Sequence, residues 1–300
     1  MRSALVEVED LYLSVPAGPL HMQRKPILQG VRFAVPEGAR AAYLGPNGAG
    51  KTSTFRVLCR LVRPDRGYVR YRGKPWIPPR RMGFLPEQPY FYRNLTPREL
   101  LRAFGRLVGM RAPDAAIRHW CARLEVAHVL DQRLSACSKG QLQRIGLVLA
   151  LLHDPEFLLL DEPMSGLDPL GRELVAEVLR EVAAQGKTIL FSTHILGDAE
   201  DLCDHAIVLH KGRVRYEGAM EALLAGEGRK YRIRFRAAQA WEGARALGGG
   251  VQEVVCGAEE KEMLFARLVQ AGAEVLELAP LRRSLEEAFS ELIGEDRGDA

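Results

Sequence analysis

Cysteine is scarce in this sequence, and its arrangement excludes two common kinds of small site. The chain of 300 residues has five cysteines, an odd number, and no two of them form a C-x-x-C pair. Disulfide frameworks and structural zinc sites both need grouped cysteines. We therefore expect reduced thiols and a cytoplasmic location, with neither a disulfide framework nor a zinc site.

Long apolar runs and a strong charge of one sign are also missing. No apolar stretch approaches the roughly 18 residues that a membrane-spanning helix needs, and the acidic start MRSALVEVED is not typical of a signal peptide. The formal net charge is only +4, without a long basic tract. The sequence therefore predicts a globular protein without membrane spans, and nucleic acid is not expected as a partner.

What the sequence does contain is a glycine-rich stretch, GPNGAGKTS, at residues 45–53. It fits the pattern G-x-x-x-x-G-K-[ST], and its flanks predict a strand before it and a helix after it. Such a loop directs successive N–H groups at one anion, while a lysine and the helix N-terminus add positive charge. We expect these residues to bind the phosphates of a nucleotide: Gly45, Pro46, Asn47, Gly48, Ala49, Gly50, Lys51, Thr52 and Ser53.

Strand and helix signals alternate along the chain and predict a mixed α/β sheet. In the first part we expect strands at 5–15, 27–35, 41–44, 68–71, 157–160, 188–191, 206–210 and 213–216, a loop at 16–26, and helices at 97–108, 114–130, 138–152 and 168–184. In the second part we expect strands at 231–235, 251–255 and 274–278 and helices at 239–247, 260–271 and 284–292. The domains are therefore predicted as 1–225, with a helical subdomain at about 90–153, and 229–293.

The segment FLLLDEP supplies two adjacent carboxylates at the end of a buried strand. Ligands collect at the carboxyl ends of strands in open α/β sheets. Because side chains alternate along a strand, Asp161 and Glu162 would point apart, one toward a Mg²⁺ shell and the other toward an attacking water. The alternative is a strand that simply ends in a polar turn, and the phosphate-binding loop favours the catalytic interpretation.

At this point the chain resembles the nucleotide-binding subunit of an ABC transporter. The motifs occur in the order of that family: GPNGAGKTS, then FLPEQP, CSKGQLQR, FLLLDEP, SGLD and FSTHIL. The match covers about residues 4–220. The resemblance implies the ABC type of P-loop ATPase core with a mixed sheet, a helical subdomain, and ATP with Mg²⁺ as its ligands.

The resemblance also implies roles for single residues. Lys51 and Thr52 would bind phosphates and Mg²⁺, and Asp161 would act on the metal shell. Glu162 would be the general base or would orient the water, and His194 would hold the γ-phosphate.

A second group of residues would connect the site to other chains. Gln88 would sense Mg²⁺ and the γ-phosphate and couple the site to the membrane subunit. Ser138, Gly140 and Gln141 begin a helix that, in this family, faces the γ-phosphate bound by the opposite subunit. Asp168 would communicate across the dimer, so that hydrolysis would need a homodimer or a heterodimer.

Two positions depart from the common pattern. Cys137 and Lys139 replace Leu and Gly of the usual LSGGQ signature. Val15 stands where the family has an aromatic residue that stacks on adenine. Either Val15 gives a weaker apolar contact or the loop at 16–26 rearranges the site, and both alternatives predict loose specificity for adenine.

The C-terminal part resembles the small α/β extension of exporter ATPases that work with type 2 permeases. Pro280, the run Ser284-Leu285-Glu286 and Phe289 match the tail of that branch. We expect a membrane permease as the partner and a cytoplasmic location on the inner face of the cell membrane. One alternative is a soluble regulatory ABC protein that does not hydrolyse ATP, which the presence of Lys51, Asp161, Glu162 and His194 disfavours. The other is a soluble ABC ATPase that acts on ribosomes or DNA. One phosphate-binding loop, and too little chain between Gly50 and Ser138 for a long coiled coil, disfavour it.

Overall fold

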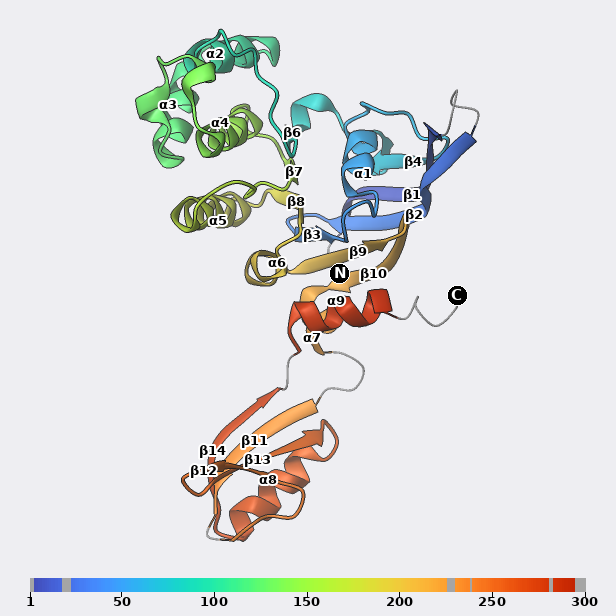
Figure 1. Cartoon of the computed structure of the whole chain (residues 1–300), viewed down its shortest axis with the longest axis vertical. Coiled ribbons are helices and arrows are strands. Elements are labelled where there is room, and N and C mark those ends of the chain that lie inside the picture. Colours follow the sequence, from blue (N-terminus) through green and yellow to red (C-terminus); the bar gives the residue numbers. More distant parts are fainter. Residues whose placement is uncertain (1–2, 18–22, 226–229, 238, 281–282, 295–300) are drawn as a thin grey trace. The chain divides into compact units, whose positions relative to one another are not determined.

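The structure is a computed structural model that describes residues 3–17, 23–225, 230–237, 239–280 and 283–294 (Figure 1). The chain divides into two compact units, Met1–Gly218 and Ala219–Ala300, here called unit 1 and unit 2. The sequence places the boundary slightly later, at residues 226–228, which lie outside the described residues. Within the described part of the chain, no helix is both long and apolar enough to cross a bilayer.

Unit 1 contains two sheets. The first is antiparallel in the order β2-β1-β4-β5. Its strands are β1 (Ala4–Ala17), β2 (Gln23–Pro36), β4 (Arg66–Tyr71) and the short β5 (Lys74–Pro75). Apolar and polar residues alternate along β1 and β4, which is typical of strands that cover a core on one face only.

The loop predicted at 16–26 is wrong at both ends. Pro16 and Ala17 still belong to β1 and pair with Arg24 and Gln23 of β2, while residues 18–22 lie outside the described part. Proline fits here because the pairing of β1 with β4 stops at Tyr12, which leaves β1 without a second neighbour at Pro16. A missing N–H is tolerated where a strand has such a free side.

The second sheet of unit 1 is mixed, as predicted, and has the order β10-β9-β3-β8-β7-β6. Strands β3 (Arg40–Leu44), β6 (Met82–Leu85), β7 (Phe157–Asp161), β8 (Thr188–Thr193) and β9 (His205–His210) pair in parallel, and β10 (Arg213–Ala219) follows β9 through a tight turn. Every residue of β7 and β8 is buried, as in parallel strands covered on both faces.

Helix α1 (Lys51–Leu58) follows β3 and packs into the main core with residues from both sheets. Three aromatic rings join these layers: the ring centroids of Phe33 and Tyr43 are 5.3 Å apart, and those of Tyr43 and Phe55 are 5.5 Å apart. Each such pair contributes about 1 kcal/mol beyond its buried area. The start of α1 is thereby fixed relative to the sheets, which is what positions the loop before it.

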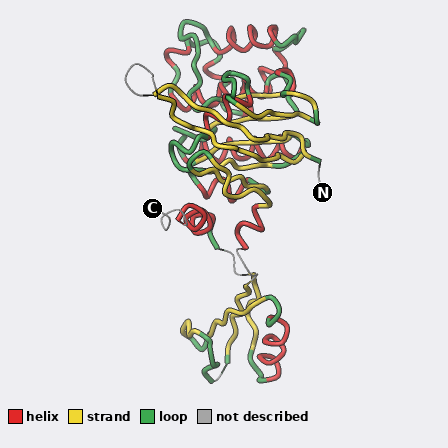
Figure 2. Tube along the Cα trace, turned by 90° about the vertical axis from the view of Figure 1, so that its right-hand side faces the viewer, coloured by secondary structure: helices red, strands yellow, loops and turns green. Residues whose placement is uncertain are grey.

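Unit 1 also carries further helices, which lie to one side of the strands in Figure 1 and behind and above them in Figure 2. These are α2 (Pro97–Leu107), α3 (Asp114–Arg123) and α4 (Lys139–Leu151), with α5 (Pro169–Ala184) and α6 (Leu196–Leu202) later in the chain. The helix predicted at 114–130 is too long. It ends at Arg123 because Glu125 takes a left-handed conformation (φ 52°), and only a 3₁₀ turn follows over Ala127–Val129.

Unit 2 has its own sheet, in the order β12-β13-β11-β14, covered by one helix. It consists of α7 (Met220–Ala225), β11 (Lys230–Arg236), β12 (Arg245–Gly248), β13 (Val251–Gly257), α8 (Lys261–Gln270), β14 (Glu274–Pro280) and α9 (Leu285–Gly294). Its small core contains Ile233, Phe235, Val254, Cys256 and Leu268. Ion pairs such as Arg234–Glu253 and Arg232–Glu277 link its strands.

The helix predicted at 239–247 is wrong. The described residues there form a loop and then strand β12. The amide side chain of Gln252 holds this loop, because its Oε1 accepts the N–H of Trp241 and its Nε2 donates to the carbonyl of Gln239, both at 2.7 Å. Gly243 has a positive φ of 79°, which a helix interior does not allow.

Candidate nucleotide-binding site

The glycine-rich loop lies between the end of β3 and the start of α1, as its sequence predicts. Gly48 and Gly50 have positive φ angles of 82° and 112°, and a Cβ atom on Gly45 would lie 2.4 Å from the carbonyl oxygen of Leu209. Glycine is therefore needed at Gly50 for conformation and at Gly45 for space. The backbone curls into a concave turn, a shape in which N–H groups can bind an anion. Within it, the N–H of Ala49 donates to the carbonyl oxygen of Pro46 at 3.1 Å.

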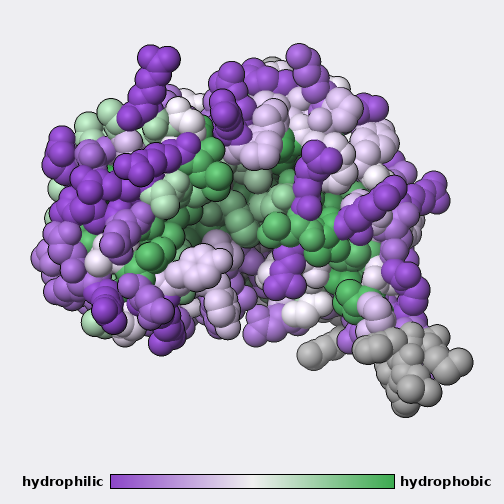
Figure 3. Space-filling view, turned by 90° about the horizontal axis from the view of Figure 1, so that it is seen from above, coloured by the Kyte–Doolittle hydropathy of each residue, from purple (hydrophilic) through white to green (hydrophobic). Residues whose placement is uncertain are grey.

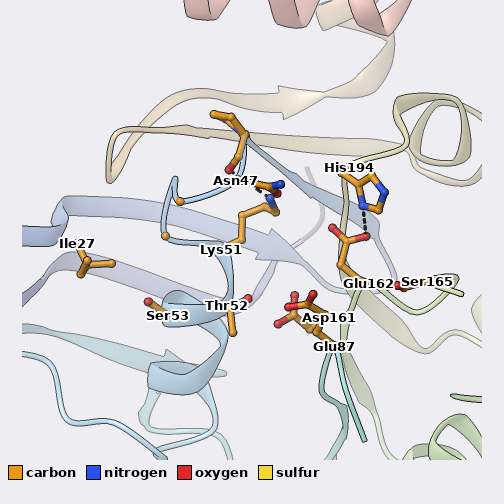
Figure 4. Close-up of a pocket in the computed structure, with 13 residues that line it drawn as sticks. Ile27, Asn47, Lys51, Thr52, Ser53, Glu87, Asp161, Glu162, Ser165 and His194 are labelled. Carbon is orange, nitrogen blue, oxygen red and sulfur yellow. Dashed lines mark hydrogen bonds and ion pairs between the residues drawn. The ribbon is translucent and has the colours of Figure 1, made fainter. Parts of the chain in front are cut away.

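A cavity of about 480 Å³ opens beside this loop (Figure 4). The loop and the ends of β7 and β8 supply most of its walls. Its lining residues are Ile27, Pro46, Asn47, Gly48, Gly50, Lys51, Thr52, Ser53, Glu87, Asp161, Glu162, Ser165 and His194. A phosphate-binding loop and two adjacent carboxylates, far apart in the sequence, therefore face the same space.

Lys51 is the basic residue of the loop and is only 8% exposed. Its Nζ donates a hydrogen bond of 2.6 Å to the carbonyl oxygen of Gly45. Burial lowers the pKa of the Lys51 ammonium, and the charges of Glu162, Asp161 and Glu87 act in the opposite direction. A phosphate in the cavity would add a further negative charge and favour the protonated form.

Asp161 is the last residue of β7 and is 2% exposed. Its Oδ1 accepts a hydrogen bond of 2.5 Å from the hydroxyl of Ser192 on β8. A buried carboxylate that also faces a cavity is suited to a divalent cation, because the cation compensates its charge. Figure 4 shows Asp161 across the cavity from Thr52, next to Glu87.

Glu162 directly follows the strand and has a positive φ of 51°. Its carboxylate Oε2 lies 2.7 Å from Nδ1 of His194, and its side chain is only 12% exposed. The amide of Gln143 on α4 donates to the carbonyl oxygens of Glu162 and Pro163, at 3.1 and 3.3 Å. The backbone at Glu162 is thus fixed from the helical layer as well as from the sheet.

Gln88 and Val15, both expected in the site, do not line this cavity. Gln88 lines a different cavity together with Tyr90 and Phe91, whereas its neighbour Glu87 lines the cavity at the loop. Val15 is 38% exposed on β1 and does not line the cavity, whereas Ile27 of β2 does.

Sequence reasoning missed Glu87, Ile27 and Ser192. For Glu87 the only signal was its place in FLPEQP, directly before Gln88, which the sequence predicts as a site residue. For Ser192 the signal was a hydroxyl in FSTHIL, two residues before His194.

The signature segment forms the N-terminus of α4. The Ser138 side chain accepts the N–H of Gln141 at 3.2 Å, and the Gln141 side chain accepts the N–H of Ser138 at 2.8 Å. This is a capping box, and Gly140 follows the cap inside the first turn. Ser138, Gly140 and Gln141 are not among the lining residues of the cavity.

Asp168 caps a different helix. Its Oδ1 accepts the N–H of Gly171 at 3.0 Å at the start of α5. The turn before it lies against the signature segment, since a Cβ atom on Gly166 would lie 2.7 Å from Cε of Lys139. Lys139 and Gly166 are therefore in contact, so the two motifs adjoin within one chain.

Comparison with known proteins gives a consistent result. Residues 28–165 match the family model described as ABC transporter. The chain is 41% identical over 211 residues to Nod factor export ATP-binding protein I of Paraburkholderia xenovorans, covering 68% of this chain and 69% of that one. It is 33% identical over 264 residues to an ABC transporter ATP-binding protein of Alkalihalophilus pseudofirmus, covering 84% and 98%.

Solved structures of ATP-binding cassettes share the fold of this chain. A structure described as an ATP-binding subunit of an ABC transporter is 32% identical, with a TM-score of 0.66 over 73% of this chain and 91% of that chain. A dimeric ATP-binding cassette with ADP and phosphate shares the fold at 21% identity, with a TM-score of 0.67 over 72% and 99%. The expected α/β fold is thereby confirmed, and the chain belongs to the ABC transporter family as one of its ATP-binding, ATP-hydrolysing subunits.

Proposed function

We propose that this subunit binds ATP with Mg²⁺ in the cavity at residues 45–53 and cleaves the γ-phosphate between two such subunits, to drive a separate membrane permease. The observation that carries the proposal is the convergence on one cavity of Lys51, Asp161 and the Glu162–His194 pair. A phosphate cradle, a metal-binding carboxylate and a group that orients water are what phosphoryl transfer to water requires.

The donor set fits magnesium. The Thr52 hydroxyl and the carboxylates of Asp161 and Glu87 supply hard oxygen atoms around one cavity. These residues would hold Mg²⁺, whose charge would offset the negative charge of the phosphates. The described residues contain no group of three His, Cys, Asp or Glu side chains that could hold a metal by themselves, so the phosphates and water would complete the metal shell.

Glu162 is the residue that acts on water in this proposal. The imidazole of His194 donates from Nδ1 to the Glu162 carboxylate at 2.7 Å and so fixes its direction. The carboxylate then accepts a hydrogen bond from the water that attacks the γ-phosphate. Lys51 leaves the Gly45 carbonyl for the phosphates, which are the stronger acceptors.

The second subunit supplies what the cavity lacks. The capped N-terminus of α4, with Ser138, Gly140 and Gln141, is a partly positive end with N–H donors but stands outside this cavity. In a symmetric dimer each chain would present this end to the nucleotide of the other, with Asp168 near the contact. The related ATP-binding cassette with ADP and phosphate is a dimer, which supports this proposal.

A permease of the exporter type is the proposed partner, reached from the cytoplasmic face of the membrane. The relatives named Nod factor export ATP-binding proteins favour the exporter branch. An apolar groove of about 640 Å³ lies on unit 1, and Figure 3 shows hydrophobic side chains gathered in a hollow. Tyr90, Phe91 and Tyr92 line the groove with residues of α2 and α4, and Tyr90 and Tyr92 are strongly exposed.

ATP turnover by the purified protein tests the nucleotide site. Wild-type protein should hydrolyse ATP only with Mg²⁺, and Lys51→Ala should abolish binding, because the cradle loses its one full charge. GTP should be hydrolysed at a similar rate, since Ile27, an apolar side chain that lines the cavity, would offer a base no hydrogen bonds. A strong preference for ATP would contradict the loose base specificity, and unchanged binding by the Lys51 variant would contradict the site itself.

Copurification tests the partner. The chain extracted from membranes with mild detergent should bring a permease with it. Replacing the exposed tyrosines Tyr90 and Tyr92 with serine should reduce this association without reducing ATP binding, because neither residue lines the cavity at the loop. Association with ribosomes or nucleic acid, and with no permease, would favour the alternative of a soluble ABC ATPase.

A further inference from the structure

Ser192 stands beside the catalytic carboxylates on the neighbouring strand. Asp161 of β7 is paired directly with Ser192 of β8 in the parallel sheet. Ser192 has no exposed surface. Its side chain therefore cannot contact solvent, and its hydroxyl must find its hydrogen bonds inside the protein.

One hydroxyl contacts both members of the carboxylate pair. Oγ of Ser192 donates to Oδ1 of Asp161 at 2.5 Å and accepts the N–H of Glu162 at 3.0 Å. The carbonyl oxygen of Ser192 lies 3.2 Å from the same N–H. Ser192 thus holds the side chain of one residue and the peptide group of the next.

The peptide that it holds is strained. Glu162 has a φ of 51°, in the left-handed region, which costs a non-glycine residue conformational energy. Such a conformation persists where the surroundings fix it. In the described part of the chain, the N–H of Glu162 is fixed by Ser192, and its carbonyl by Gln143 of α4.

Two other hydroxyl side chains of β8, Thr193 and Thr188, form hydrogen bonds away from the carboxylate pair. The hydroxyl of Thr193 accepts the N–H of Ile195 at 3.0 Å, two residues along its own chain. Thr188 at the other end of β8 is also buried, and its hydroxyl accepts the N–H of Gly38 at 2.8 Å. Thr188 thus has a buried hydroxyl on the same strand but does not line the cavity, which makes it a suitable control.

We propose that Ser192 is a positioning residue for hydrolysis, an inference that rests on the proposed function. Its hydrogen bond to Oδ1 fixes the direction of the Asp161 carboxylate, which would act on the metal shell. Its acceptor contact holds the Glu162 peptide in the turn that directs the carboxylate to His194. One side chain thereby couples the geometry of the metal-binding carboxylate to that of the residue that acts on water.

The test compares Ser192→Ala with Thr188→Ala in the full-length protein. The readouts are Mn²⁺ affinity by electron paramagnetic resonance with a non-hydrolysable ATP analogue, ATP turnover, and thermal stability. Loss of a residue that orients a metal ligand typically costs about 10- to 100-fold in metal affinity or activity. Ser192→Ala should show a loss of that size in both, whereas Thr188→Ala should lower only the melting temperature.

Further variants keep the test decisive if Ser192→Ala does not fold. Ser192→Cys nearly preserves the side-chain volume with a much weaker donor and should show the same loss of Mn²⁺ affinity. Ser192→Thr keeps the hydroxyl and should restore it. Unchanged Mn²⁺ affinity in the folded Ala or Cys variant, or an equal loss in Thr188→Ala, would overturn the proposal. Wild-type protein that binds no Mn²⁺–nucleotide would instead refute the proposed function, and the role of Ser192 with it.

Discussion

The residues that face the cavity carry three carboxylates, from Glu87, Asp161 and Glu162, and one ammonium, from Lys51. A triphosphate that enters without a metal therefore meets more negative than positive charge. Glu87 is the member of this set that the loop after β6 contributes. We therefore expect its charge to make nucleotide binding depend on a divalent cation more strongly than an amide at that position would.

Replacing Glu87 with glutamine tests this charge effect. Glu87→Gln should bind ATP in EDTA about threefold more tightly than wild type, which is the size expected for one partly screened charge at a distance of about 10 Å. The measurement is titration with a fluorescent ATP analogue, with and without Mg²⁺. Glu173→Gln is the matched control, because it removes the same charge from a side chain that lines another cavity. Equal changes in both variants would contradict the assignment of Glu87 to the site.

A half-buried histidine gives a prediction on how stability depends on pH. His153 follows α4, its Nε2 lies 3.1 Å from the carbonyl oxygen of Met82, and its ring packs edge-on against Phe104. Burial lowers the pKa of His153 despite opposing effects of the Met82 carbonyl and Asp154. Below about pH 6.5, where a free histidine takes up a proton, the unfolded chain binds protons first. The free energy of unfolding therefore decreases as the pH is lowered from about 6.5 to the folded pKa.

Urea midpoints at pH 7.5 and 5.5 check this prediction. Wild type should lose more stability between the two values than His153→Gln, whose side chain does not titrate. His119→Gln, at an exposed position on α3, serves as the control and should behave like wild type. Equal acid sensitivity of the His153 variant and wild type would show that the imidazole does not contribute.

At the scale of elements, two helices of unit 1 begin with the same device. Thr96 with Glu99 caps α2, and Ser138 with Gln141 caps α4, each as a complete capping box. Both caps stabilise their helices by satisfying orphan N–H groups. In the proposed dimer only the N-terminus of α4 also meets a phosphate.

Variants of the two caps distinguish an effect on stability from an effect on ATP hydrolysis. Ser138→Ala and Thr96→Ala should each destabilise the protein by about 1 kcal/mol. Only Ser138→Ala should also lower ATP turnover, by at least about tenfold, because it removes a group that meets the γ-phosphate. Denaturation curves and turnover rates of both variants make the comparison. Full turnover in Ser138→Ala would remove the α4 end from the site.

Elements were predictable from the sequence where local signals decide them. The strand, loop and helix around Lys51 follow from apolar spacing and the glycine-rich pattern, and the strand that ends at Asp161 follows from its apolar run. The helix predicted at 239–247 failed because Gln252, which comes later in the chain, holds that loop through its side-chain amide.

The site residues, too, could be predicted only where a sequence motif identifies them. Lys51, Asp161, Glu162 and His194 were identified as site residues by motif, and they line one cavity. Ser192 was not, because its contact with Asp161 depends on which strands become neighbours in the sheet.

At the scale of the whole molecule, one chain has the phosphate cradle and the carboxylates, while its signature helix end lies outside the cavity. In the proposed dimer a second copy would bring this helix end to the nucleotide, so each site would be complete only when two copies meet. Cleavage of the γ-phosphate would remove the charge that joins the two copies and let them separate. Coupling to the permease would follow from this cycle of closing and opening.

The most direct test of this claim is sedimentation velocity of Glu162→Gln with and without Mg²⁺–ATP. Without the carboxylate that acts on water, ATP should remain uncleaved, so the variant should be monomeric alone and dimeric with Mg²⁺–ATP, with no turnover. Lys51→Ala in the same background should remain monomeric under both conditions. A Glu162→Gln protein that stays monomeric with bound Mg²⁺–ATP, or that continues to hydrolyse it, would contradict the account.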